Sequence, residues 1–238
     1  MRVDRRGNDE LRPIKLTTDY LIHPEGSVLV EFGNTKVICT ATIEPDVPPF
    51  LKQSASGWVT AEYSMLPRAT STRTKRERQK LSGRTSEIQR FIGRSLRSIV
   101  DLKAFPECQI VIDCDVIQAD GGTRTASLTG GFVAMVEAFK KMKKAGDLVR
   151  EPIRDYVAAV SLGKVQGVLR LDLDYSEDSM AEVDMNLVMT SRKQLVEIQG
   201  TAEKTPFPPE VLHEMLEFGW RGIEHLIAIQ REAIGSLE

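Results

Sequence analysis

The sequence predicts an α+β protein built from two similar halves. Runs of alternating apolar and polar residues lead into a stretch with helical periodicity, and this order of strands and then helices occurs twice. We place the division near residue 150, with a first half of about 1–150 and a second of about 151–238. Because no low-complexity linker separates the halves, we expect a single domain over residues 1–238.

The first half opens with a predicted antiparallel hairpin. Residues Ile14 to Glu44 alternate in strand fashion around the turn residues of Phe32-Gly33-Asn34-Thr35. Another strand is predicted over Gly57 to Met65. The basic tract that follows, from Pro67 to Arg84, lacks a regular pattern, which is typical of a long exposed loop.

The remaining elements follow from periodicity and from proline and glycine positions. From Thr85 to Leu102, apolar residues recur at helical spacing and leave Arg90, Arg94 and Arg97 on another face. A strand over Cys108 to Ile117 is followed by a glycine-containing turn and a helix through Lys144. The second half is predicted to hold strands at Tyr156 to Leu162, Val168 to Tyr175, Ala181 to Thr190 and Gln194 to Gln199, and a helix from Pro209 to Ile234.

Charge and cysteine content narrow the class of protein. The net charge is only −2, yet lysines and arginines crowd into residues 68–97, which suits a polyanion or, alternatively, a solvated loop. The three cysteines, Cys39, Cys108 and Cys114, are odd in number and lie in strand-like runs, so we expect no disulfide framework and a cytoplasmic location. With no signal region and no span of membrane length, we expect neither export nor membrane insertion.

A strand-to-helix segment holds the first candidate site. Gly121 and Gly122 allow close backbone approach, Thr123 adds a hydroxyl, and Arg124 adds a forked positive charge suited to phosphate. The alternative is an ordinary helix start capped by threonine. The Gly-Lys-Ser/Thr ending of a nucleotide P-loop is missing, which removes the main support for a kinase or ATPase.

A cluster of carboxylates around the predicted strand Val168 to Tyr175, the turn after it and the next strand forms the second candidate site, and its members are Asp172, Asp174, Glu177, Asp178, Glu182 and Asp184. Period-two spacing puts Glu182, Asp184 and Asn186 on one strand face, where carboxylates could hold Mg²⁺ or simply form the solvated face of a sheet. The sequence lacks a zinc-protease motif and any recognisable Ser or Cys nucleophile paired with a histidine. Zinc hydrolysis and covalent catalysis therefore have no support.

Several long motifs follow one another along the chain, and they are Arg5 to Arg12, Leu81 to Arg97, Cys114 to Ser127, Asp172 to Asp178, Ala181 to Asn186 and Glu197 to Glu203. In this order they resemble the RNase PH family of exoribonucleases over essentially the whole chain. The resemblance implies the ribosomal protein S5 domain 2-like fold with two related βαβ-containing halves, and a homohexamer arranged as a trimer of dimers. It also implies phosphorolysis, in which inorganic phosphate attacks the 3′-terminal phosphodiester and releases a nucleoside diphosphate.

The resemblance assigns roles to particular residues. Phosphate would be bound by Arg84, Gly122, Thr123 and Arg124, and the acidic pair Asp178 and Asp184 would hold Mg²⁺ and, with Arg84 and Arg124, form the catalytic set. We favour metal binding over a general-acid role for the aspartates, because neighbouring positive charges keep carboxylates ionised.

The substrates that the resemblance implies are tRNA precursors, trimmed of the nucleotides that follow the CCA end. Ribosomal RNA and reverse addition of nucleotides are further expectations. Arg68, Arg73 and Arg76 would contact the body of tRNA, and Arg90, with Arg94 and Arg97, would either line the RNA path or contact other subunits. The rivals are an inactive RNA-binding ring subunit, which should lack one of the two charged pairs, and a small-molecule kinase, which needs a nucleotide loop.

Overall fold

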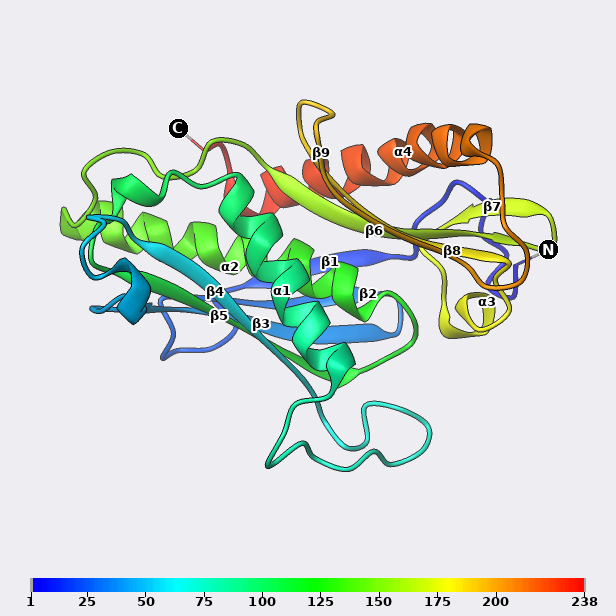
Figure 1. Cartoon of the computed structure of the whole chain (residues 1–238), viewed down its shortest axis with the longest axis horizontal. Helices are drawn as coiled ribbons and strands as arrows, with labels where there is room; N and C mark the ends of the chain where they lie inside the picture. The colour runs from blue at the N-terminus through cyan, green and yellow to red at the C-terminus, as the bar shows by residue number, and fades with distance from the viewer. Residues whose placement is uncertain (1, 238) are drawn as a thin grey trace.

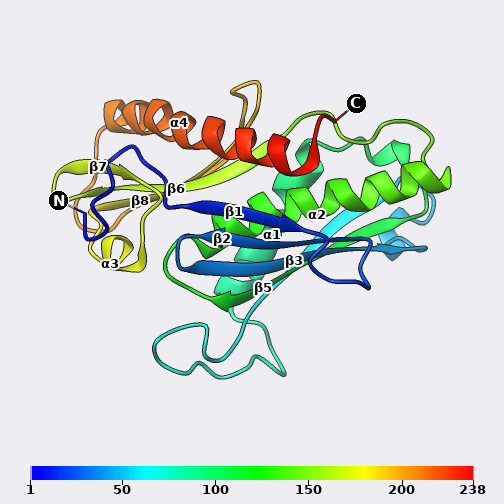
Figure 2. The same cartoon turned by 180° about the vertical axis from the view of Figure 1, so that it is seen from behind.

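Two β-sheets pack against a shared helix in the computed structural model, which describes residues 2–237 (Figure 1, Figure 2). The first sheet has the strand order β1-β2-β3-β5-β4, and these strands span Ile14–Thr18, Gly26–Phe32, Thr35–Glu44, Gln109–Gln118 and Trp58–Met65. The second has the order β7-β6-β8-β9, spanning Val168–Leu171, Val157–Val165, Val183–Thr190 and Leu195–Ala202. Helices α1 to α4 span Gly83–Ser98, Thr123–Ala145, Tyr175–Asp178 and Pro209–Ile234, and the 3-10 turns η1 and η2 span Pro49–Leu51 and Leu102–Ala104. The predicted α+β class is confirmed.

Each half contains a β-α-β connection. In the first half, β4 and β5 are parallel neighbours joined through α1, and the predicted hairpin is formed by β2 and β3, with Phe32 opposite Thr35. In the second half, β7 and β8 both run antiparallel to β6. They therefore run in the same direction on either side of it, and α3 lies in the connection between them.

Helix α2 joins the two sheets. It packs on β2, β3 and β5 of the first sheet and on β6 of the second, so that nearly every residue of its middle turns is buried. One cluster of buried apolar side chains consequently extends from Val28 in the first sheet to Leu187 in the second. Helix α4 covers the second sheet and also contacts β1. The division of the chain near residue 150 stays a prediction.

Several element boundaries differ from the prediction, and two of the differences change the assignment of a whole turn of the chain. The strand predicted from Val168 to Tyr175 ends at Leu171, because Asp172 adopts a left-handed backbone (φ +50°) and Asp174 caps α3 in a reciprocal capping box with Glu177. The helix predicted to reach Leu102 ends at Ser98, two residues before Val100 forms a β-bridge with Ile153.

The prediction of free cysteines is confirmed, since Cys39, Cys108 and Cys114 are all unpaired thiols. Within residues 2–237, no helix combines the length and the apolar character that crossing a membrane requires.

Candidate active site

A pocket of about 660 Å³ lies where the first turns of α1 and α2 meet α3 and β8. Four predicted site residues that are far apart in the sequence, Arg84, Arg124, Asp178 and Asp184, line this one pocket. Its other walls are formed by Met65, Thr70, Ser71, Thr72, Thr74, Ala119, Asp120, Gly121, Gly122, Thr123, Ser161, Leu173, Tyr175 and Asn186. The structure therefore brings the predicted anion site and the predicted acidic site together.

The loop before α2, residues 120–122, presents backbone amides to the pocket. Gly121 and Gly122 have φ of +77° and +65°, and a Cβ on Gly121 would lie 2.4 Å from the Leu173 carbonyl oxygen, so glycine is required there. Within the described part of the chain, the amides of residues 121–124 find no protein acceptor, and Gly122 provides no side-chain cap. These free N–H groups, at the positive end of the α2 dipole, are suited to binding an anion.

Thr123 does not cap the helix, so the alternative of an ordinary threonine-capped start is wrong. The buried Tyr63 hydroxyl donates a hydrogen bond to the Thr123 hydroxyl oxygen at 2.9 Å. This contact leaves the Thr123 hydrogen free to donate elsewhere. Tyr63 was predicted only as a strand residue, and no short motif links it to Thr123.

The two arginines are held differently. Arg124 is half-buried, and its Nη1 donates to Gln199 Oε1 at 2.7 Å and to Glu87 Oε1 at 3.2 Å, so it joins β9 to α1. Arg84 is exposed in the first turn of α1, whose N-cap Ser82 accepts a hydrogen bond from Thr85 N. Arg84 therefore keeps its hydrogen-bonding capacity for a ligand, whereas Arg124 is already oriented.

The acidic side of the pocket resists ionisation, so the arginines beside the aspartates do not by themselves keep these carboxyls ionised, contrary to the expectation from the sequence. Burial and the negative charge of Asp178 together raise the pKa of Asp184 from 3.8 to about 6, although Arg124 opposes the rise. Asp178 is exposed at the pocket mouth, and partial desolvation raises its pKa less strongly, against the lowering effect of Arg84 and Arg124. The pair consequently favours binding either a proton or a cation.

Two carboxylates and few other ligands suit Mg²⁺. Among residues 2–237, no group of three or more His, Cys, Asp or Glu side chains is placed to hold a metal. Mg²⁺ commonly takes one or two carboxylates and completes its shell with water and substrate phosphate. Asp184 and Asn186 face the pocket, rather than forming a solvated sheet face, whereas Glu182 lies apart and accepts a hydrogen bond from Gly167 N at 3.1 Å.

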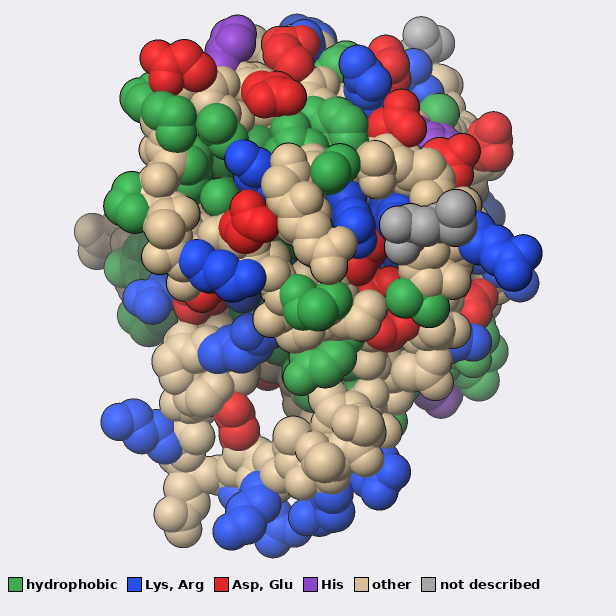
Figure 3. Space-filling view, turned by 90° about the vertical axis from the view of Figure 1, so that its right-hand side faces the viewer, with side chains coloured by type: hydrophobic (Ala, Val, Ile, Leu, Met, Phe, Trp, Pro, Cys, Tyr) green, Lys and Arg blue, Asp and Glu red, His purple; other side chains and the backbone are tan. Residues whose placement is uncertain are grey.

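The predicted RNA-binding arginines lie outside the pocket. Arg68, Arg73 and Arg76 are exposed in the long loop between β4 and α1, which projects from the body and carries a concentration of basic side chains (Figure 1, Figure 3). Arg90 is exposed on α1. The predicted loop is thus confirmed, and its threonine and serine side chains also form one wall of the pocket, which charge patterning alone does not indicate.

The other two arginines of α1 have structural partners. Arg94 pairs with Glu197 of β9 at 2.7 Å. Arg97 lies 4.2 Å above the Trp58 ring and donates to the Val59 carbonyl at 2.7 Å. The prediction that Arg97 lies on a face other than the packed one is therefore wrong, because Arg97 packs α1 onto β4.

Comparison with known proteins agrees with this site. The sequence model of the 3′ exoribonuclease family, domain 1, matches residues 10–140, and that of domain 2 of the same family matches residues 155–222. Proteins named Ribonuclease PH from Bacillus mycoides (strain KBAB4) and Bacillus cereus (strain AH820) are each 58% identical over 241 aligned positions, covering 100% of this chain and 98% of theirs.

Solved structures share the fold at low sequence identity. Rice (Oryza sativa) Rrp46 matches with a TM-score of 0.80 and 17% identity, covering 98% of this chain and 100% of its own. A chain of the Archaeoglobus fulgidus exosome with RNA bound to the active site matches with a TM-score of 0.81 and 21% identity, covering 95% of this chain and 91% of its own. The fold, the family models and the full-length relatives agree, and the chain belongs to the 3′ exoribonuclease family, as a member of its ribonuclease PH group.

Proposed function

We propose that this chain is a phosphate-dependent 3′-to-5′ exoribonuclease, a nucleotidyltransferase that removes the nucleotides following the CCA end of tRNA precursors. The observation that carries the proposal is the pocket itself, in which unpaired α2 amides and two arginines face two carboxylates. The positive side suits inorganic phosphate, and the acidic side suits a cation on the scissile phosphodiester. No side-chain nucleophile is needed, since phosphate supplies the attacking oxygen.

In the proposed reaction, a phosphate oxygen forms a bond to the 3′-terminal phosphorus, and the bond from that phosphorus to the preceding 3′-oxygen breaks. The departing 3′-oxygen takes up a proton, and the terminal nucleotide leaves as a diphosphate. Arg84, Arg124 and the amides of Gly122 and Thr123 would hold the incoming phosphate, which lowers its repulsion from the anionic diester and fixes its approach.

Asp178 and Asp184 would hold Mg²⁺, which supplies positive charge to the scissile phosphate and the departing oxygen. Asp184 could instead donate a proton in its acid form. We prefer metal binding, because a cation between the carboxylates removes the repulsion that raises the pKa of Asp184.

The exposed loop arginines Arg68, Arg73 and Arg76, with Arg90, would bind RNA beyond the reacting end. We further propose a homohexamer arranged as a trimer of dimers, a cytoplasmic location, action on rRNA, and addition of nucleotides in the reverse reaction. These four statements extend the proposal and are tested separately, by mass measurement in solution, by localisation, and by assays with rRNA and with nucleoside diphosphates.

The decisive experiment incubates 3′-extended tRNA with the protein and Mg²⁺, with and without inorganic phosphate, and identifies the released nucleotide. Phosphate-dependent release of diphosphates is expected, and phosphate-independent release of monophosphates would make the enzyme a hydrolase. Arg84→Gln should lower kcat/KM for phosphate by about 100-fold. Arg150→Gln is the matched control, because Arg150 pairs with Asp101 outside the pocket.

A further inference from the structure

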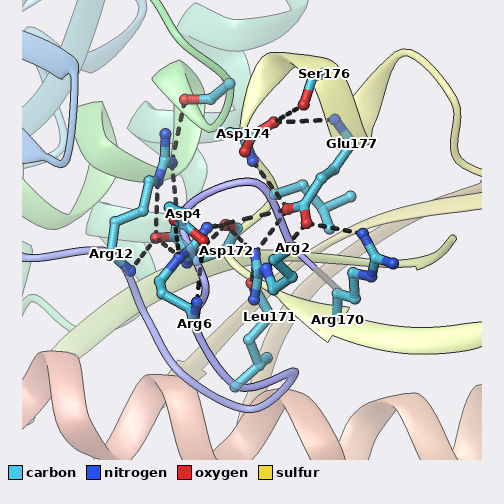
Figure 4. Close-up of polar contacts among 12 residues, drawn as sticks. Arg2, Asp4, Arg6, Arg12, Arg170, Leu171, Asp172, Asp174, Ser176 and Glu177 are labelled. Carbon is cyan, nitrogen blue, oxygen red and sulfur yellow. Dashed lines mark hydrogen bonds and ion pairs between the residues drawn. The ribbon is translucent and has the colours of Figure 1, made fainter.

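The segment of residues 2–12, which we call the N-terminal strap, runs beside α3 and the loop before α2 (Figure 4). Its side chains Arg2 and Arg12 are only 3% and 4% exposed. Burying a guanidinium is costly unless its hydrogen bonds are satisfied, so these contacts are specific rather than incidental.

Arg2 holds the helix that carries Asp178. Its Nε and Nη2 donate to the two carboxylate oxygens of Glu177 at 2.9 and 2.7 Å, and Nη2 also reaches the Leu171 carbonyl at 2.8 Å. Glu177 is 2% exposed and accepts a further bond from Arg170 at 2.9 Å. Asp178 is the next residue of this one-turn helix, so the contacts of Glu177 also constrain the position of the Asp178 carboxylate.

Arg12 holds the anion-binding loop. Its Nε and Nη2 donate to the two oxygens of Asp172 at 2.9 and 2.7 Å, and its other donors reach the carbonyl oxygens of Asp120 and Gly121. In a trans peptide the N–H points opposite to the C=O. With both carbonyls turned toward Arg12, the amides of Gly121 and Gly122 point away from it.

The same contacts join the acidic and the anion-binding sides of the pocket. Asp172, which takes the left-handed backbone noted above, is bound by Arg12, and the carbonyl oxygens of Leu171 and Asp172 accept hydrogen bonds from Arg2. A left-handed backbone is unfavourable for a residue other than glycine, and these contacts stabilise it here. The strap thus bridges residues 120–122 and 172–177, which belong to different halves of the chain.

From this geometry we infer that the N-terminal strap is a positioning element of the active site. Arg12 orients the amides that would receive phosphate, and Arg2, through Glu177, places the carboxylate of Asp178. The inference rests on the proposed phosphorolytic function and names residues that touch neither substrate.

Charge balance makes the single arginine variants suitable tests. Four arginines, Arg2, Arg6, Arg12 and Arg170, surround two buried carboxylates, Asp172 and Glu177. When Arg12 is replaced, Asp172 still has Arg6 at 3.5 Å, and when Arg2 is replaced, Glu177 still has Arg170. Neither substitution therefore leaves a buried carboxylate without a positively charged partner, and it is the loss of the last partner that strongly destabilises a fold.

The experiment compares Arg12→Gln, Arg12→Lys and Arg2→Gln with the control Arg221→Gln in the full-length chain. Arg221 pairs with Asp9 of the same strap at 3.5 Å, but both side chains are more than half exposed. Steady-state phosphorolysis of a short single-stranded RNA gives separate KM values for phosphate and for RNA. Binding of Mn²⁺, used as a spectroscopic probe for the acidic pair, is followed by electron paramagnetic resonance.

Both Arg12 variants should raise KM for phosphate by about 10- to 100-fold with little change in KM for RNA, because a misplaced binding group costs this much. Lysine should fail like glutamine, since it cannot reach Asp172 and the two carbonyls together. Arg2→Gln should weaken Mn²⁺ binding and lower kcat, while Arg221→Gln matches the wild type.

The inference fails if folded Arg12 variants keep the wild-type KM for phosphate, or if Arg12→Lys restores it, which would mean that charge alone matters. It also fails if both KM values rise equally in step with lost stability, which would indicate a purely structural role. Failure of the proposed function is distinguishable, because then the wild type itself would show no phosphate-dependent release.

Discussion

Replacing Asp184 with asparagine should stabilise the protein while abolishing its activity. The carboxyl of Asp184 is half-buried beside Asp178, and its pKa in the folded chain is about 6, against 3.8 ordinarily. The folded state therefore binds this proton more tightly than the unfolded state, and the ionised form is destabilising. Asparagine keeps the shape of the neutral acid and removes this cost.

The magnitude follows from linkage. At 1.36 kcal/mol per pKa unit, a rise in pKa from 3.8 to about 6 means that the ionised Asp184 carboxylate destabilises the folded state by about 3 kcal/mol. This destabilisation is present in full well above pH 6. The contribution is lost as the pH falls through 6 toward 3.8, and about half of it remains at pH 5. Asp184→Asn should thus gain up to about 3 kcal/mol at pH 8 and about 1.5 kcal/mol at pH 5.

Thermal or urea unfolding in the presence of EDTA measures the difference at both pH values. For a chain of this size the gain at pH 8 corresponds to a rise of roughly 6–12 °C in Tm. Mg²⁺ should stabilise the wild type more than Asp184→Asn, and so narrow the gap. A variant that is no more stable than the wild type at pH 8, or a gap that does not change between pH 8 and pH 5, would refute the reasoning.

Three further perturbations test other parts of the site. Gly121→Ala should destabilise the chain by several kcal/mol more than the control Gly146→Ala. Both glycines have positive φ, but only a Cβ at residue 121 would collide with backbone atoms. Equal urea midpoints for the two variants would contradict this. Tyr175 is an exposed aromatic residue at the pocket wall and should stack on a base of the RNA. Tyr175→Ala should therefore raise KM for RNA about 10-fold or more, while Tyr175→Phe keeps the wild-type KM. An equal rise of KM in both variants would exclude stacking. Replacing Arg68, Arg73 and Arg76 together with glutamine should reduce the salt slope of tRNA binding by about 2 to 3 and spare a short RNA, whereas equal loss on both RNAs would place these arginines in the chemistry.

Local patterns predicted the elements well, and failed where distant residues decide the outcome. The bounds of α4 match the prediction because Pro209 starts the helix and its periodicity is long. The sequence Asp174 to Glu177 carried a capping-box signal, but the alternation before it favoured a longer strand. Arg97 showed only helical spacing, and its packing on Trp58 depends on how α1 lies across β4.

The residues of the candidate site were predicted, but the contacts of Arg2 and Arg12 that hold the site in place were not. Motif resemblance indicated Arg84, Arg124, Asp178 and Asp184, and the structure places all four around one pocket. Nothing local to Arg12 or Arg2 indicates their partners, which lie 160 and 175 positions away. Contacts of that separation are set by the tertiary fold, so periodicity and spacing cannot show them.

These long separations also constrain the order in which the enzyme matures. Residues 2–12 leave the ribosome well before Asp172 and Glu177 exist, so the two arginines have no acidic partners while the first half is being made. A chain stopped near residue 150 would carry Arg84, Arg124 and the glycine loop, yet lack Asp178 and Asp184 and the buried carboxylates that hold the strap. Synthesis of the second half therefore supplies both the acidic side of the pocket and the carboxylates that hold the strap, so we expect a truncated chain to lack the proposed activity.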